Sequence, residues 1–359
     1  MSSPDAPRPF IVIGENIHTS RVVRREGSRG GTTPDGRPAV RFPDGAGGEA
    51  LLPVPEAILK TKEFASNGRI KHVMAAVLSG MAAGPDAALA QAYVRWMAAR
   101  QIAGGAAYLD LNVDEVDSDV EGRCRAMTWL VRAVGPVSSV PLSLDSSDSA
   151  VLAVGLDAYD PGWAGGAAPL INSASAERPD VLDLAKERGS PVVLSSTGDS
   201  MPTGTEERMV RAVEIIEMAV ARGLPLSSLH VDPLIIPIGV DAEAGVAYLD
   251  AVRQLRERYG AELHITGGIS NVSFGMPARR IISDVFLDLC VGAGQDSGIV
   301  DPVAADVARA LTPDRDAEPY RLAADLLLGV DAFGVEFLDA FRSGRLSEPS
   351  ATERTTASS

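Results

Sequence analysis

The sequence contains few cysteines, histidines and aromatic residues. Among its 359 residues there are two cysteines and four histidines, and aromatic residues make up 5%. Cys124 and Cys290 lie in apolar helical contexts without CxxC spacing, which makes a disulfide framework and a cysteine metal site poor explanations. The sequence therefore predicts a protein of a reducing compartment, the cytoplasm.

Targeting signals, membrane spans and excess positive charge are also missing. The N-terminal MSSPDAPRPF has no basic region followed by an apolar run, so we expect no signal peptide. No apolar stretch approaches the roughly 20 residues that cross a bilayer, so we expect no membrane association. The 33 Lys and Arg are outnumbered by 48 Asp and Glu, and this net charge of −15 argues against nucleic-acid binding.

What the sequence does contain is eight short apolar segments that alternate with helical ones. The first, Phe10 to Gly14, is apolar throughout, which is typical of a strand buried on both faces. The others are centred near residues 109, 143, 170, 193, 230, 265 and 299. An open doubly wound sheet is the rival arrangement, but no GxGxxG follows the first strand and no Walker-type motif occurs. We predict a single α/β domain, a (β/α)8 TIM barrel.

Changes in composition mark the edges of this domain. We expect residues 1–9 to be a loose N-terminus, 10–342 to form the barrel, and the Ser- and Thr-rich residues 343–359 to be a disordered tail. Gly, Pro, Arg and Asp dominate residues 24–48, which predicts a long loop or a β-hairpin inserted after the first strand, with a turn at Asp35-Gly36.

Helices are predicted between the strands from apolar spacing and cap residues. They cover Pro55–Ala65, Pro85–Ala103, Gly122–Val134, a stretch to Tyr159 capped by the Ser146–Asp148 cluster, Pro179–Arg188, Glu206–Arg222 with Thr205 as the cap, Ala242–Tyr259, Ala278–Ala293 and Tyr320–Phe341.

Acidic and amide residues follow the carboxyl ends of the predicted strands, where a barrel has its mouth. They are Glu15, Asn16, Asp110, Asn112, Asp145, Asn172, Asp232, Asn271 and Asp301. None is Lys, Arg or His, so a phosphate site is disfavoured. Of the four histidines, His18 and at most His264 lie near this rim, so a metal-dependent hydrolase is disfavoured and we assign no metal ligands.

Paired carboxylates and amides suit a flat heterocycle that carries ring N–H and amino groups, such as a pterin or a guanine-like ring. Each residue taken alone could equally be a strand-end cap or a loop turn. Pro233 removes one local donor from Asp232. The segment Leu263–Gly275 begins as a short strand that ends at Gly267-Gly268. The two glycines permit unusual backbone angles or the close approach of a ligand. Asn271, which follows them, either faces a substrate or stabilises its own loop.

Six ordered segments resemble the pterin-binding methyltransferase family. They are FIVIGEN at 10–16, YLDLNV at 108–113, LDSS at 144–147, INS at 171–173, HVDPLIIP at 230–237 and ISNVS at 269–273. The family includes methyltetrahydrofolate:corrinoid methyltransferases and the folate-binding module of cobalamin-dependent methionine synthase. This chain departs from it in the 24–48 insertion, at Asp114-Glu115, where a glycine is expected, and at Phe274-Gly275, where relatives vary.

The resemblance implies a set of site residues. The pterin would be held by Asp145, Asn172, Asp232 and Asn271, with Asp110 and Asn112 lining the same mouth. Asn271 would hydrogen-bond nitrogen 5 of the folate and stabilise the change of charge there, and Asp145 would act through the network by orienting a water or an Asn.

The resemblance also implies an activity: transfer of a methyl group between nitrogen 5 of tetrahydrofolate and the cobalt of a corrinoid, in a direction that the sequence leaves open. No histidine lies in a DxHxxG cobalt-binding motif, so we expect the corrinoid to arrive on a partner protein. Tetrahydrofolate or 5-methyltetrahydrofolate would be the small-molecule substrate, and a homodimer is expected from relatives. Residues 24–48 are a candidate contact surface or lid, or simply a loop.

Two alternatives stay open. Dihydropteroate synthase is a more distant relative on the same barrel, and its displacement of pyrophosphate needs basic residues. Asn16 and Arg279-Arg280 are compatible with it, but no Lys stands in a matching strand-end context. The other alternative is a non-catalytic module that holds folate within a larger assembly.

Overall fold

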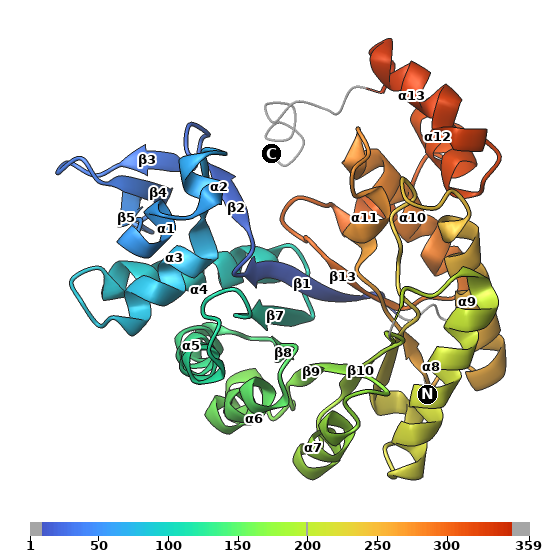
Figure 1. Cartoon of the computed structure of the whole chain (residues 1–359), viewed down its shortest axis with the longest axis horizontal. Helices are drawn as coiled ribbons and strands as arrows, with labels where there is room; N and C mark the ends of the chain where they lie inside the picture. The colour runs from blue at the N-terminus through green and yellow to red at the C-terminus, as the bar shows by residue number, and fades with distance from the viewer. Residues whose placement is uncertain (1–8, 199, 347–359) are drawn as a thin grey trace.

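The computed structural model describes residues 9–198 and 200–346, which form a ring of parallel strands surrounded by helices (Figure 1). The strands of the ring are β1 (Ile11–His18), β7 (Tyr108–Asn112), β8 (Leu142–Asp145), β9 (Leu170–Ala174), β10 (Val192–Ser195), β11 (Leu229–Asp232), β12 (His264–Ile265) and β13 (Ser297–Val300). The predicted loose terminus at 1–9 and tail at 343–359 lie mostly outside the described residues.

The eight strands pair in the order β12, β11, β10, β9, β8, β7, β1, β13, and every pair is parallel. A bridge between Gly268 and Ile299 joins the two ends of this order, and the N–H of Ile299 donates to the carbonyl of Gly267 at 2.9 Å. The sheet is therefore nearly closed on itself, and the predicted (β/α)8 TIM barrel is confirmed.

Seven of the helices that cover the barrel correspond to predicted segments. They are α4 (Ala87–Ala103), α5 (Val120–Val134), α6 (Ser149–Ala158), α7 (Asp180–Arg188), α8 (Gly204–Ala221), α9 (Ala244–Tyr259) and α10 (Arg279–Ala293). The prediction of Thr205 as the cap of α8 is wrong: the cap position is Thr203, and the Thr205 hydroxyl donates to the Ala247 carbonyl at 3.2 Å. No helix of the described residues has the length and apolar character needed to cross a membrane.

Helix predictions fail where short turns interrupt an apolar stretch. The segment at 55–65 forms two short helices, α1 (Glu56–Leu59) and α2 (Lys62–Ala65), and Thr61 caps the second by accepting from Phe64 N. The segment at 320–341 divides into α12 (Glu318–Leu327) and α13 (Val335–Arg342), with Gly329 between them at a φ of 72°. Helices α3 (His72–Met81) and α11 (Val307–Ala310) have no predicted counterpart.

The insertion after β1 is a small folded unit rather than a bare loop. It contains β3 (Gly30–Thr32), β4 (Pro38–Pro43) and β5 (Glu49–Pro53) in one antiparallel sheet, and β2 (Val22–Arg24) paired with β6 (Arg69–Lys71). Buried Phe42 packs edge-on against Tyr93 of α4, with ring centroids 5.1 Å apart, so the sheet is fixed to the barrel. In Figure 1 the unit (blue) stands beyond the carboxyl end of β1.

Candidate active site

Side chains alternate between the two faces of each strand, and those inside the barrel form a polar layer at its mouth above an apolar layer. Every second residue of a strand points to the same side of the sheet. Inside the barrel, one set packs as a small apolar cluster of Ile13, Tyr108, Leu170, Val193 and Ile299. Two positions further along the same strands stand Glu15, Asp110, Asn172, Ser195 and Asp301. The polar residues therefore share the carboxyl end of the barrel, above the cluster.

Four of the predicted site residues form one hydrogen-bonded network across β7, β8 and β9. The amide nitrogen of Asn112 donates to Asp145 Oδ2 at 2.9 Å, and that of Asn172 donates to Asp110 Oδ1 at 3.3 Å. Ser143 Oγ also donates to Asp110 Oδ1, at 2.6 Å. Ser143 was not predicted, although it lies two positions before Asp145 and therefore on the same face of β8.

In this network Asp110 is buried and Asp145 is half-buried, and no Lys or Arg of the described residues forms an ion pair with either carboxyl group. Burial raises the pKa of Asp110 to about 6, and the charge of Glu15 adds to the effect. The pKa of Asp145 is raised well above its usual range, by burial first and then by the charges of Asp110 and Asp114. The two carboxyl groups therefore resist being charged at the same time. A ligand rich in N–H donors would compensate this charge.

This burial predicts that Asp110→Asn stabilises the ligand-free protein at pH 7.5, by about 2–3 kcal/mol. A raised pKa means that the folded protein binds more protons than the unfolded chain, so wild-type stability falls as the pH rises from about 4 through about 6. The Asn carbonyl can still accept from Ser143 and Asn172 without carrying a buried charge. Urea unfolding at pH 4.5 and 7.5 measures the difference, and equal pH slopes in the two proteins would contradict the prediction.

The other two predicted residues, Asp232 and Asn271, flank the Gly267-Gly268 pair. A Cβ on Gly267 would lie 3.4 Å from Asp232 Oδ1 and 2.6 Å from the Tyr248 hydroxyl, and one on Gly268 would lie 2.8 Å from Asn271 Nδ2. Gly268 has an ordinary φ of −76°. The pair is therefore needed for close approach of side chains, not for unusual backbone angles.

Asp232 and Asn271 differ in burial and in hydrogen bonding. Burial raises the pKa of Asp232 to about 6, and its Oδ1 accepts from Leu234 N at 2.8 Å. Pro233 therefore does not remove every local donor, because the next residue supplies one. Asn271 is the exposed residue of the 3-10 turn Ile269–Ser273, and no hydrogen bond ties its amide to another side chain of the described residues. Its amide is free to turn toward a ligand.

Glu15 and Asp301 share a cation that the sequence analysis did not single out. Arg21 lies 2.6 Å from Glu15 Oε1 and 3.6 Å from Asp301 Oδ2. Ser270 Oγ, next to Asn271 in the chain, is 3.4 Å from Glu15 Oε1. These four residues line a cavity of about 380 Å³ at the rim. Asn16, also expected at the mouth, instead donates its backbone N–H to Gln101 of α4 at 2.9 Å.

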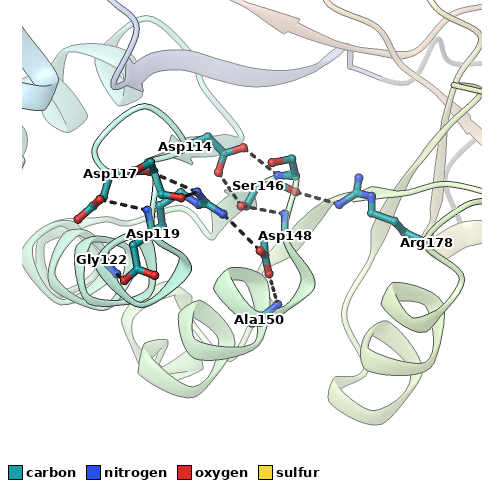
Figure 2. A network of polar contacts seen from close by, with 11 residues as sticks. Asp114, Asp117, Asp119, Gly122, Ser146, Asp148, Ala150 and Arg178 are labelled. Carbon is teal, nitrogen blue, oxygen red and sulfur yellow. Dashed lines mark hydrogen bonds and ion pairs between the residues drawn. The ribbon is translucent and has the colours of Figure 1, made fainter. Parts of the chain in front are cut away.

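Figure 2 shows how the loops after β7 and β8 are joined. Asp114 accepts from the Ser146 hydroxyl at 2.6 Å, and its own N–H donates to Asn112 Oδ1 at 3.0 Å. Asp119 and Asp148 cap the helices α5 and α6 that follow. Asp114, at a position where the family resemblance led us to expect a glycine, therefore links the loops that follow the strands ending in Asn112 and Asp145.

The fold and the mouth together define a (β/α)8 barrel with an acidic, amide-lined site. Residues 82–301 match the family described as pterin binding enzyme, and the chain belongs to that family. The resemblance predicted from the sequence is confirmed.

Several known proteins are similar to this chain. The chain is 28% identical over 263 residues to the methylcorrinoid:tetrahydrofolate methyltransferase of Eubacterium limosum, covering 71% of this chain and 89% of that protein. It is 31% identical over 257 residues to a methionine synthase of Mycobacterium leprae, covering 67% of this chain but only 20% of the relative. A dihydropteroate synthase structure from Xanthomonas albilineans superposes with a TM-score of 0.52 at 20% identity, over 85% of this chain and 92% of that one, which shows the shared fold.

Proposed function

We propose that the protein is a methyltransferase that moves a methyl group between nitrogen 5 of tetrahydrofolate and a corrinoid carried by a partner protein. The observation that carries the proposal is the carboxylate and amide set at the mouth, in which Asn112 donates to Asp145 and Asn172 donates to Asp110. The similarity to a protein named for transfer between a methylcorrinoid and tetrahydrofolate supports it.

In this proposal the pterin ring is bound by carboxylate and amide groups that can still accept a hydrogen bond from a ligand. The second oxygen of Asp232, which no backbone N–H occupies in the described structure, accepts from the ring N–H and amino groups. Asn172 both donates and accepts at the ring edge. Binding replaces water around these buried carboxylates with N–H donors, which favours their charged forms.

The chemical step requires help at nitrogen 5. A methyl group on a tertiary amine is a poor electrophile, and the nitrogen keeps the electron pair when the N–CH₃ bond breaks. A cobalt(I) corrinoid is the nucleophile that takes the methyl group. The Asn271 amide donates a hydrogen bond to the nitrogen and so offsets the growing charge. Asp145 positions a water or Asn112 through the network. As the methyl group leaves, nitrogen 5 takes up one proton from water, and in reverse the same groups help it to lose that proton.

Methyl transfer from 5-methyltetrahydrofolate to free cob(I)alamin, followed by the absorbance of methylcobalamin, tests the proposal. Free cobalamin removes the need to know which partner protein carries the corrinoid in the proposed reaction. Turnover is the expected result. Folate binding without turnover would point to a non-catalytic module, and formation of dihydropteroate from a pterin pyrophosphate and 4-aminobenzoate would point to a synthase.

A further inference from the structure

A two-stranded ribbon of β2 (Val22–Arg24) and β6 (Arg69–Lys71), here called the basic ribbon, rises from the rim of the mouth. It begins one residue after Arg21, which contacts Glu15 and Asp301. Residues 21–71 contain ten Arg and Lys against six Asp and Glu, although the whole chain carries a net charge of −15. The insertion is therefore a local cationic region on an acidic protein.

Two like charges lie directly opposite each other on this ribbon. Arg24 pairs with Arg69 in the antiparallel register, and both side chains are exposed. Like charges in directly opposed positions destabilise a strand pair. Within the described residues, neither the Arg24 nor the Arg69 guanidinium forms an ion pair with an acidic side chain. An anion from outside the chain would relieve this repulsion.

The basic face of the ribbon borders the mouth. Lys71 lies on the same face as Arg69, and its ammonium is 2.8 Å from Glu115 Oε2. Glu115 belongs to the loop after β7, and its backbone N–H donates to Thr19 Oγ1 at 3.3 Å. This ion pair turns the face that carries Arg69 and Lys71 toward the loop that follows Asn112 at the end of β7. An extended ligand leaving the site on this side would meet Arg24 and Arg69.

We propose that the basic ribbon binds the γ-linked oligoglutamate tail of a folate whose pterin ring lies in the mouth, an inference that rests on the proposed function. Each glutamate adds one carboxylate, and Arg binds carboxylates with two parallel hydrogen bonds. The rim after β7 and β8 carries Asp114, Asp117 and Asp148, which repel such a tail. Attraction at the ribbon and repulsion at this acidic rim together direct the tail to one side.

Comparison of 5-methyltetrahydrofolate carrying one glutamate with the form carrying five tests the inference. In methyl transfer to free cob(I)alamin at low salt, we expect the KM of wild type for the pentaglutamate to be about tenfold lower, as two exposed ion pairs allow. In Arg24→Gln/Arg69→Gln this preference should shrink to about twofold or less, with kcat and the monoglutamate KM unchanged. Raising the salt concentration should reduce the wild-type preference in the same way.

Arg125→Gln/Arg253→Gln is the matched control, because it removes the same charge from exposed positions on α5 and α9. It should keep the wild-type preference. Equal KM values for the two folates in wild type, or a preference that survives in Arg24→Gln/Arg69→Gln, would overturn the inference. If the preference survives in Arg24→Gln/Arg69→Gln, the basic ribbon binds a different anion, such as an acidic protein surface. If wild type shows no turnover, the proposed function fails, and calorimetric Kd values for the same two folates still decide the role of the ribbon.

Discussion

Asn271→Ala is expected to lower kcat for methyl transfer to cob(I)alamin by about 10²–10³-fold while raising the Kd for 5-methyltetrahydrofolate by no more than about threefold. The structure gives the physical reason. The Asn271 amide is exposed and has no side-chain partner among the described residues, so removing it leaves no buried group unsatisfied. Its proposed contact is made to nitrogen 5 as charge develops there, so the loss falls on the transition state.

Gly268→Ala provides a second way to disturb the same side chain. The new Cβ would stand 2.8 Å from Asn271 Nδ2, and a flexible exposed amide can move away from it. We expect a smaller loss of kcat than in Asn271→Ala and an unchanged melting temperature. Stopped-flow measurement of one turnover gives the chemical step, and fluorescence titration gives Kd. Equal losses of kcat and of binding in Asn271→Ala would assign Asn271 to substrate binding instead.

The sequence was sufficient for the barrel because its eight strands are short apolar runs that alternate with helical segments, and local composition carries that signal. The positions of polar residues at the strand ends predicted much of the site. Asp110 and Asn112 lie two positions apart on β7, and both join the network that Asp145 and Asn172 complete. Strand-end position and residue type were enough to bring four of the six residues together.

Other parts of the site depend on contacts that no local pattern encodes. Arg21 lies outside the predicted strand, and only the return of β13 beside β1 brings Asp301 close to it. The Asp114 contact with Ser146 joins two loops 32 residues apart in the chain. The inserted sheet was difficult to predict because its strands are short, and their burial comes from packing on Tyr93 of α4.

Asp232→Asn is expected to raise the Kd for 5-methyltetrahydrofolate at pH 7.5 by about 10²–10³-fold, with kcat at saturating folate changed by less than about threefold. Burial raises the pKa of Asp232 to about 6, and the positive charge of Arg208 acts in the opposite direction, so the carboxylate is mostly charged at this pH. Two charge-assisted hydrogen bonds from the pterin together contribute about 3–4 kcal/mol. An Asn offers one acceptor and turns an N–H toward the ring donors.

The pH dependence separates this role from a structural one. Wild-type Kd should rise as the pH falls through about 6, because protonation of Asp232 removes a charged acceptor, whereas Kd of Asp232→Asn should vary less. The fold should be retained, since the Asn oxygen can still accept from Leu234 N, and the loss of a buried charge should stabilise the ligand-free variant at pH 7.5. Calorimetric titrations between pH 5 and 8 measure both proteins. If Asp232→Asn kept wild-type affinity but lost kcat, Asp232 would act in the chemical step and would not be the residue that binds the pterin ring.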